Sequence, residues 1–207
     1  MSTRLLLVRH GQTAWNADGR FMGQLDVPLD EIGRTQVLAV AKRLATEEPA
    51  AIYSSDLARA RETAQAIQAA IGSHPEIKLD ARLREMHFGD WQGLTYTEMI
   101  AKDAGSLGRW QADPLNVAPP NGETLIMLTE RVKAAYEDIC AAHSEETVIV
   151  AGHGGSLQIL IVAALGLPPE TFWNMQLSNA SLSVLRLHDI RIFLSLLNGT
   201  SHLAPSG

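Results

Sequence analysis

The chain has 207 residues and a formal charge of -6 at pH 7, from 17 Lys and Arg against 23 Asp and Glu. Nucleic acid is a disfavoured partner, because phosphate backbones are bound by a clustered excess of Lys and Arg, which this chain lacks. With 46% hydrophobic and 19% charged residues, the composition excludes a disordered chain and predicts one globular domain over residues 1–203, followed by a loose tail at 204–207.

The first predicted element is a strand at residues 5–8. These residues form an uninterrupted apolar run, Leu-Leu-Leu-Val, which is typical of a strand buried on both faces of a parallel sheet. Arg9 and His10 follow directly, so the run is too short for a signal peptide or a membrane span. We therefore expect a cytoplasmic protein without a membrane partner.

The next predicted elements alternate between helix and strand. A helix covers residues 30–47, a short apolar strand residues 51–53, and a second amphipathic helix residues 57–71. The apolar stripe of this second helix leaves Arg59 and Arg61 on opposite flanks. Helical geometry alone therefore does not decide which arginine faces a ligand.

Residues 86–122 are rich in Gly and Pro and show no clear period. Such stretches seldom pack a core, so we expect an excursion over one edge of the sheet that acts as a lid or selects the substrate. Trp91 and Trp110 lie in this segment and are expected to pack, although a substrate contact stays open for them. The role of His87 is also left open.

The last predicted elements complete the fold class. Helices are expected at residues 123–142 and 156–165, with a buried strand at 147–151 between them, and two late strands at 182–187 and 191–197 form a hairpin around His188 and Asp189. Strands alternating with helices predict an α/β three-layer sandwich, in which a mostly parallel central sheet carries helices on both faces.

Two predicted strands end in the same dipeptide, His-Gly. They deliver His10 and His153, and ligands of open parallel sheets bind just beyond the carboxyl ends of the strands. A third strand end leads into the helix that carries Arg59 and Arg61 near its first turn, where free N–H groups favour an anion. These side chains are therefore expected to meet at one ligand. The alternative, that each imidazole only hydrogen-bonds a loop carbonyl, stays open at this point.

Residues 7–16, Leu-Val-Arg-His-Gly-Gln-Thr-Ala-Trp-Asn, resemble the Arg-His-Gly signature of the histidine phosphatase superfamily, the phosphoglycerate mutase-like enzymes. The likeness continues in family order through residues 20–26, 54–60, 83–89, 122–124 and 151–154. It spans nearly the whole chain, and it implies a phosphoglycerate mutase-like fold for the single domain at 1–203.

The resemblance also implies a catalytic site. It makes His10 the nucleophile and Glu85 the proton donor, although Glu85 alone would have been interpreted as a surface residue that pairs with Arg82 or Arg84. The positions that surround the phosphoryl group in the family are matched by Arg9, Arg59 and His153, where Arg59 is chosen because it precedes Ala in the motif. Further positions that line the phosphate pocket are matched by Asn16, Gly23 and Gly154.

The chemistry of phosphoryl transfer explains these residue types. A neutral imidazole nitrogen attacks phosphorus, and guanidinium groups match the charged equatorial oxygens in geometry. The resemblance therefore implies a phosphomonoester hydrolase that acts on a small phosphorylated metabolite through a phosphohistidine, with α-ribazole-5'-phosphate phosphatase as one candidate. The alternatives are a cofactor-dependent phosphoglycerate mutase and a non-catalytic phosphate-ligand binding protein.

Other chemistries lack their signatures in this sequence. No Gly-x-Ser-x-Gly elbow and no P-loop occur, and no metal-ligand spacing is present, so neither a metal nor a cofactor is predicted. A mutase is disfavoured because Lys102 and Arg109 are the only basic residues between Glu85 and Glu123, and Gly155 replaces the Asn of the mutase pattern. The physiological substrate and the oligomeric state are left undetermined.

Overall fold

The computed structural model describes residues 2–188 and 191–203. Among these residues, six strands form one sheet in the order β3-β2-β4-β1-β5-β6. The strands are β1 (Thr3–Arg9), β2 (Ala51–Ser54), β3 (Ile77–Leu79), β4 (Thr147–Gly152), β5 (Leu182–His188) and β6 (Arg191–Gly199). The β1, β2, β3 and β4 strands pair in parallel, whereas β5 is antiparallel to β1 and β6 is antiparallel to β5.

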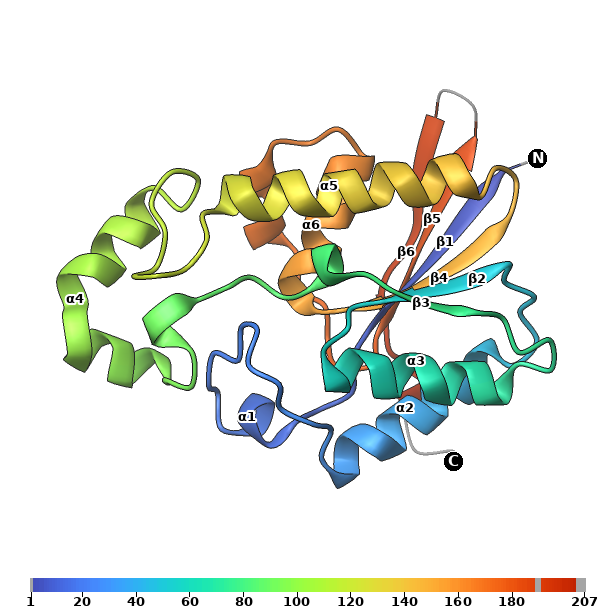
Figure 1. The fold of residues 1–207 in the computed structure, drawn as a ribbon, viewed down its shortest axis with the longest axis horizontal. Coiled ribbons are helices and arrows are strands. Elements are labelled where there is room, and N and C mark those ends of the chain that lie inside the picture. Colours follow the sequence, from blue (N-terminus) through green and yellow to red (C-terminus); the bar gives the residue numbers. More distant parts are fainter. Residues whose placement is uncertain (1, 189–190, 204–207) are drawn as a thin grey trace.

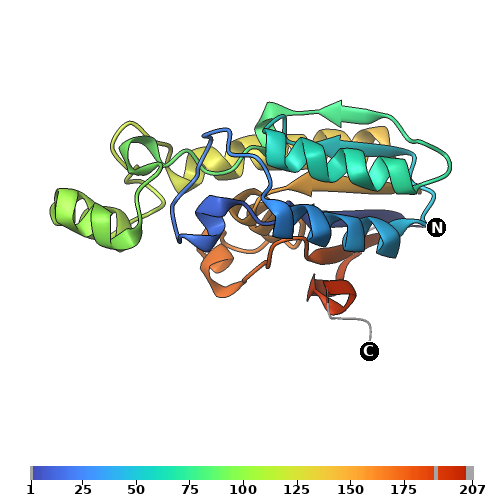
Figure 2. The same cartoon turned by 90° about the horizontal axis from the view of Figure 1, so that it is seen from below.

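Helices cover both faces of this sheet, which confirms the predicted three-layer α/β sandwich (Figures 1 and 2). The helices α2 (Glu31–Leu44) and α3 (Ala58–Ala70) lie on one face, and α5 (Leu125–Ala142) and α6 (Gly154–Ala164) lie on the other. The short helical turns outside these layers are α1 (Ala14–Ala17), η1 (Ala81–Leu83), η2 (Gly89–Trp91), η3 (Pro169–Asn174) and η4 (Ser201–Leu203). Within the described ranges, no helix has both the length and the apolar character needed to cross a membrane.

The β1 strand is buried on both faces, as its uninterrupted apolar run predicts. Leu5 and Leu7 join the cluster under α5 and α6, while Leu6 and Val8 join the cluster under α2 and α3. Each of these four side chains is at most 1% exposed. Burial of a side chain of this size stabilises the fold by about 1.5–3 kcal/mol, so β1 is held firmly from two sides.

Several element boundaries differ from the predicted ones for local reasons. The α5 helix begins at Leu125 because the Thr124 side chain caps it, accepting from the Met127 N–H, and α6 begins at Gly154, directly after the His153 cap. The edge strand β3 was not predicted, because its three residues are too few to show a pattern. The β5 and β6 strands pair as predicted; the turn at Asp189 and the tail at 204–207 lie outside the described residues.

The segment at residues 86–122 is more regular than its glycines and prolines predict. It contains α4 (Tyr96–Ala112), which is interrupted by a non-helical Asp103 and projects away from the sheet in Figure 1. Trp91 and Trp110 are 1% and 6% exposed, so both pack as expected, but the expectation that the segment lacks a core was wrong. Asp103 and the nearby glycines break the helical period, which hid α4 from the sequence analysis. A lid function stays a prediction.

Candidate active site

The two His-Gly dipeptides lie side by side at the carboxyl edge of the sheet. The β1 and β4 strands are parallel neighbours with Arg9 opposite Gly152, so the next residue of each strand is a histidine. The ring centroids of His10 and His153 are 5.1 Å apart in an edge-to-face arrangement, and the residues are 1% and 0% exposed. The expected convergence of two imidazoles is therefore present in the fold.

One hydrogen bond fixes the tautomer of His10. Its Nδ1 lies 2.6 Å from the Gly11 carbonyl oxygen, and because a carbonyl only accepts, Nδ1 must carry the proton. Burial, together with the positive charges of Arg59 and Arg9, holds the pKa of His10 well below its ordinary value. The ring is therefore neutral at pH 7, with its lone pair on Nε2.

His153 is also buried as a neutral ring. Burial is the main cause that lowers its pKa well below the ordinary value, and the charge of Arg59 adds to the shift. Among the described residues, neither ring nitrogen of His153 has a hydrogen-bond partner. In the free protein, His153 therefore offers a neutral ring to the site.

Arg59 is the arginine that faces the site. It lies in the first turn of α3 and is 0% exposed, whereas Arg61 is exposed, so the choice that the resemblance made is supported by the placement of both side chains. The Arg59 guanidinium donates to the carbonyls of Gly23, at 2.7 Å, and Leu25, at 2.8 Å. Burial lowers the pKa of Arg59 to about 10, which still leaves the group charged at neutral pH.

Gly23 is required by its surroundings. Its φ of +52° is unfavourable for other residues, and a Cβ there would lie 2.1 Å from the side-chain oxygen of Gln92. Since the Gly23 carbonyl holds Arg59, this glycine acts on the site through the arginine that it orients.

Arg9 brings a second guanidinium to the same place. Its Nη1 donates to the Leu177 carbonyl, while its buried Nε has no hydrogen-bond partner among the described residues. Burial lowers the pKa of Arg9, and the nearby carboxylate of Glu85 opposes this shift. The site thus holds two guanidinium groups that are largely shielded from water.

Glu85 joins the site from the segment between η1 and η2. Its Oε1 accepts from the Met86 N–H at 2.9 Å, and its Oε2 accepts from the Gly155 N–H at 3.2 Å. The alternative interpretation of Glu85 as a surface partner of Arg82 or Arg84 is not what the structure shows. Those arginines bind other carboxylates, namely those of Asp56, Asp80 and Asp138.

A guanidinium beneath this segment fixes the backbone around Glu85. Arg131 of α5 donates to the carbonyls of Arg82, Arg84 and Glu85 at 2.7, 2.8 and 2.9 Å. Its charge is paired with the buried Glu123, whose Oε1 also accepts from the His87 N–H. The segment that carries Glu85 is therefore tied to α5. His87, left open by the sequence, serves this turn, because its Nδ1 accepts from the Gly89 N–H.

The remaining predicted residues lie at the same place. A pocket of about 200 Å³ is lined by Arg9, Asn16, Gly19, Arg20, Phe21, Met22, Gly23, Glu85 and Phe88. A Cβ built on Gly154 would lie 3.7 Å from both the Arg9 guanidinium and Glu85 Oε2, which places this glycine at the pocket edge. The structure therefore brings all eight predicted site residues together.

Two further residues beside the site, Asn179 and Arg131, were not predicted from the sequence. Asn179 precedes β5, and its side-chain amide donates to backbone and side-chain oxygens of the His10 loop. The only available signal was indirect: a late strand antiparallel to β1 places its preceding loop beside His10. Arg131 lies eight residues after the recognised Glu123, but neither spacing nor period indicated that the two pair.

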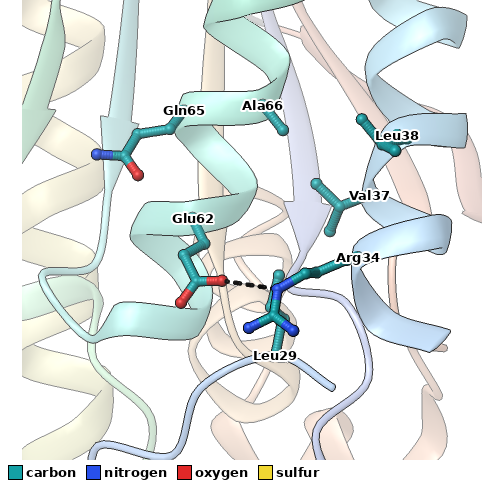
Figure 3. Close-up of a pocket in the computed structure, with 7 residues that line it drawn as sticks. All are labelled: Leu29, Arg34, Val37, Leu38, Glu62, Gln65 and Ala66. Carbon is teal, nitrogen blue, oxygen red and sulfur yellow. Dashed lines mark ion pairs between the residues drawn. The ribbon is translucent and has the colours of Figure 1, made fainter. Parts of the chain in front are cut away.

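Another hollow lies away from these residues, between α2 and α3. It measures about 300 Å³ and is lined by Leu29, Arg34, Val37, Leu38, Glu62, Gln65 and Ala66 (Figure 3). Arg34 and Glu62 face each other across it at 3.8 Å. It shares no residue with the predicted site and contains no pair of buried charges.

The arrangement can hold an oxyanion and attack it. The buried guanidinium of Arg59 and the half-buried one of Arg9 supply positive charge, the Nε2 atom of His10 supplies a lone pair, and the Glu85 carboxyl group can exchange a proton. Over the described ranges, no group of three or more His, Cys, Asp or Glu side chains has the arrangement needed to hold a metal ion.

Comparisons with known proteins find similar phosphatases over nearly the whole chain. A family model described as "Histidine phosphatase superfamily (branch 1)" matches residues 5–200. The chain is 39% identical to a glucosyl-3-phosphoglycerate phosphatase of Mycolicibacterium vanbaalenii, over 82% of this chain and 77% of that protein. It is 34% identical to phosphoserine phosphatase 1 of Hydrogenobacter thermophilus, over 97% and 94%. The structure of the α-ribazole phosphatase from Shigella flexneri superposes with a TM-score of 0.87 at 28% identity, covering 95% and 96% of the two chains.

Proposed function

The chain belongs to the histidine phosphatase superfamily, branch 1, and on that premise we propose that it hydrolyses phosphomonoesters of small metabolites through a phosphohistidine at His10. One observation carries the proposal. The hydrogen bond from Nδ1 to the Gly11 carbonyl leaves the lone pair of the buried ring on Nε2, next to two guanidinium groups. A nitrogen in this state is a nucleophile, and the charges beside it suit a phosphoryl group.

In the first step, Nε2 of His10 bonds to phosphorus while the bond between phosphorus and the ester oxygen breaks. The Glu85 carboxyl group gives its proton to the departing alkoxide, and Arg9 and Arg59 balance the charge of the equatorial phosphoryl oxygens. Because these guanidinium groups are already held by backbone carbonyls, they need little rearrangement as the transition state forms.

In the second step, water attacks the phosphohistidine. The Glu85 carboxylate takes a proton from this water, the bond between phosphorus and Nε2 breaks, and inorganic phosphate leaves. The ring returns to its neutral form with the proton still on Nδ1. His153 and Asn16 contact the phosphoryl oxygens during both steps. This scheme needs no metal or organic cofactor.

The leaving group is a small alcohol, and α-ribazole 5'-phosphate remains one candidate substrate. The relatives with higher sequence identity are named for phosphoserine and glucosyl-3-phosphoglycerate, which both carry a carboxylate. The pocket offers Phe21 and Phe88 as an apolar wall, and its Arg20 is paired with Glu98 at 2.8 Å.

A cytoplasmic location fits a phosphatase of such metabolites.

Two features favour hydrolysis over mutase chemistry. Lys102 and Arg109 are both exposed on α4 and bind local partners, the Asp90 carbonyl and the Ser106 hydroxyl, so they do not form a clamp for a carboxylate. In addition, a side chain at Gly155 would meet Glu85 Oε1 at 2.5 Å, so an Asn at this position would displace the proposed acid.

The test is a panel of phosphomonoesters combined with rapid quench. The panel contains α-ribazole phosphate, phosphoserine, glucosyl-3-phosphoglycerate, sugar phosphates and nucleotides. We expect release of inorganic phosphate and a trapped phosphoryl group, stable to base and labile to acid, on the peptide that contains His10. Phosphate trapped on Ser54 or Ser55 would reject the mechanism. If phosphate binds but no phosphoenzyme forms, the chain is a binding protein.

The mutase alternative has a separate assay. It supplies 3-phosphoglycerate with and without a bisphosphoglycerate primer and follows both free phosphate and 2-phosphoglycerate. Isomerisation that depends on the primer and outpaces phosphate release would replace the phosphatase by a mutase. We expect the opposite result.

A further inference from the structure

Asn179 lies in the loop that precedes β5, and the sheet topology brings this loop to the site. Because β5 runs antiparallel to β1, its first residue, Leu182, pairs with Val8, next to the end of β1. The Ala180 N–H donates to the His10 carbonyl at 3.0 Å, which anchors the loop against the proposed nucleophile. Asn179 is thereby held beside His10 and Gly11, the residues that follow β1.

The chemistry of its neighbours fixes the orientation of the Asn179 amide. Its Nδ2 lies 3.2 Å from the His10 carbonyl oxygen, 3.3 Å from the Gly11 carbonyl oxygen and 3.2 Å from Asn16 Oδ1. All three atoms are acceptors, so only a donor fits among them. The opposite rotation of the Asn179 amide would place four oxygens together, which no hydrogen bond relieves.

The contact between Asn179 and Asn16 helps to orient the amide of Asn16, which lines the pocket. Asn16 Oδ1 accepts from Asn179 Nδ2 and also from the Thr13 N–H at 3.1 Å. The Thr13 hydroxyl donates to the same oxygen at 3.2 Å, so three donors hold the amide oxygen of Asn16 on the side of the loop. The amide nitrogen is left as the group that Asn16 offers to the pocket it lines together with Arg9 and Glu85.

We propose that Asn179 is a positioning residue, which holds the Asn16 amide so that its N–H groups, and not its oxygen, face the phosphoryl group. The two carbonyls of residues 10 and 11 fix Asn179, and Asn179 fixes Asn16 together with Thr13. This inference rests on the proposed function, because it explains how one donor of that same site is oriented. An amide that turned its oxygen to the phosphoryl group would repel the oxyanion instead of binding it.

The experiment makes two substitutions at Asn179. Each is tested in the presence and in the absence of the Asn16 amide that Asn179 is proposed to orient. Asn179→Ala removes the donor, and Asn179→Asp keeps the shape but replaces the donor by acceptors. Both are made in the wild-type chain and in Asn16→Ala. The matched control is Asn198→Gly: Asn198 Oδ1 accepts from the Ser178 N–H at 2.7 Å and anchors the same loop without touching the site, and Gly tolerates its φ of +52°.

Two quantities are measured for each variant: kcat/KM on the best ester of the panel, and the affinity for inorganic phosphate by calorimetry. We expect Asn179→Ala to lower kcat/KM about tenfold and Asn179→Asp to lower it further, because a hydrogen bond to a charged group is at stake. In the Asn16→Ala background both losses should shrink to about twofold or less. Asn198→Gly should retain wild-type kcat/KM.

Three outcomes would overturn the inference. They are equal losses in both backgrounds, a loss in Asn198→Gly as large as that in Asn179→Ala, or an Asn179→Asp variant that matches wild type. If Asn179→Ala does not fold, the nearly isosteric Asn179→Asp carries the same comparison. Failure of the proposed function looks different: the wild-type chain would release no phosphate from any ester, while phosphate affinity would still report whether Asn179 acts through Asn16.

Discussion

The contact between Gly155 and Glu85 yields a sharp prediction about the proposed acid. A Cβ at position 155 would lie 2.5 Å from Glu85 Oε1, so the carboxylate has to retreat by about 0.9 Å to reach an ordinary contact of 3.4 Å. That retreat weakens the hydrogen bonds from the N–H groups of Gly155 and Met86. A misplacement of about 1 Å can cost about 100-fold in rate, so Gly155→Ala should lower kcat on an alkyl phosphate by about that factor.

The assay compares two esters. A nitrophenyl phosphate needs little help from an acid because its leaving oxygen is weakly basic, so Gly155→Ala should affect it much less than the alkyl ester. Gly154→Ala is the matched comparison, because its Cβ would meet nothing closer than 3.7 Å, and its loss should be at least tenfold smaller. Both positions are helical, where Ala is favoured over Gly by about 0.5–1 kcal/mol, so unfolding does not explain a loss.

Two results would refute this reasoning. If Gly155→Ala kept wild-type activity on the alkyl ester, the carboxylate of Glu85 would not need its present position. If the variant lost activity equally on both esters, the added methyl group would disturb phosphate binding and not the proton transfer.

Three further predictions follow from the same site. Glu85→Gln should slow the alkyl ester far more than the nitrophenyl ester; equal losses in steady-state rates would make Glu85 a positioning residue. His10 and His153 are buried as neutral rings with lowered pKa values, so below about pH 6.5 the unfolded chain binds protons that the folded chain does not. The free energy of unfolding should therefore fall as the pH drops from 6.5, by at most about 1.4 kcal/mol per pH unit for each ring, and denaturant titrations of His153→Asn should show a shallower fall. Because Arg9 and Arg59 supply the charge, EDTA should leave the rate unchanged while vanadate inhibits competitively; a rate lost to EDTA and restored by a divalent ion would contradict the scheme.

The sequence predicts those parts of the fold that depend on local pattern. Residues 5–8 and 147–151 are uninterrupted apolar runs, and each is a central strand of the sheet. The short edge strand β3 was not predicted because three residues show no period. The kinked helix α4 was not predicted because Asp103 interrupts its helical period. Their conformations depend on neighbours distant in the chain.

In the candidate site, too, the residues placed by local pattern were predicted, and those placed by distant contacts were not. His10 and His153 were predicted from the residues alone because they end parallel strands, and the sheet must bring such ends together. Arg59 could not be separated from Arg61 by helix geometry, because the choice depends on the carbonyls of a distant loop. Asn179 had no local signal at all, since its importance arises from the antiparallel pairing of β5 with β1.

The double burial of β1 has a consequence for how the protein opens. His10 directly follows a strand whose side chains join both hydrophobic clusters, so local fluctuations cannot release it without breaking both layers at once. We therefore expect the amide hydrogens of β1 and β4 to exchange only when the whole domain unfolds, and those of the exposed turns of α4 to exchange through openings of lower free energy. On this expectation, α4 opens many times while the sheet edge that carries His10 and His153 stays assembled.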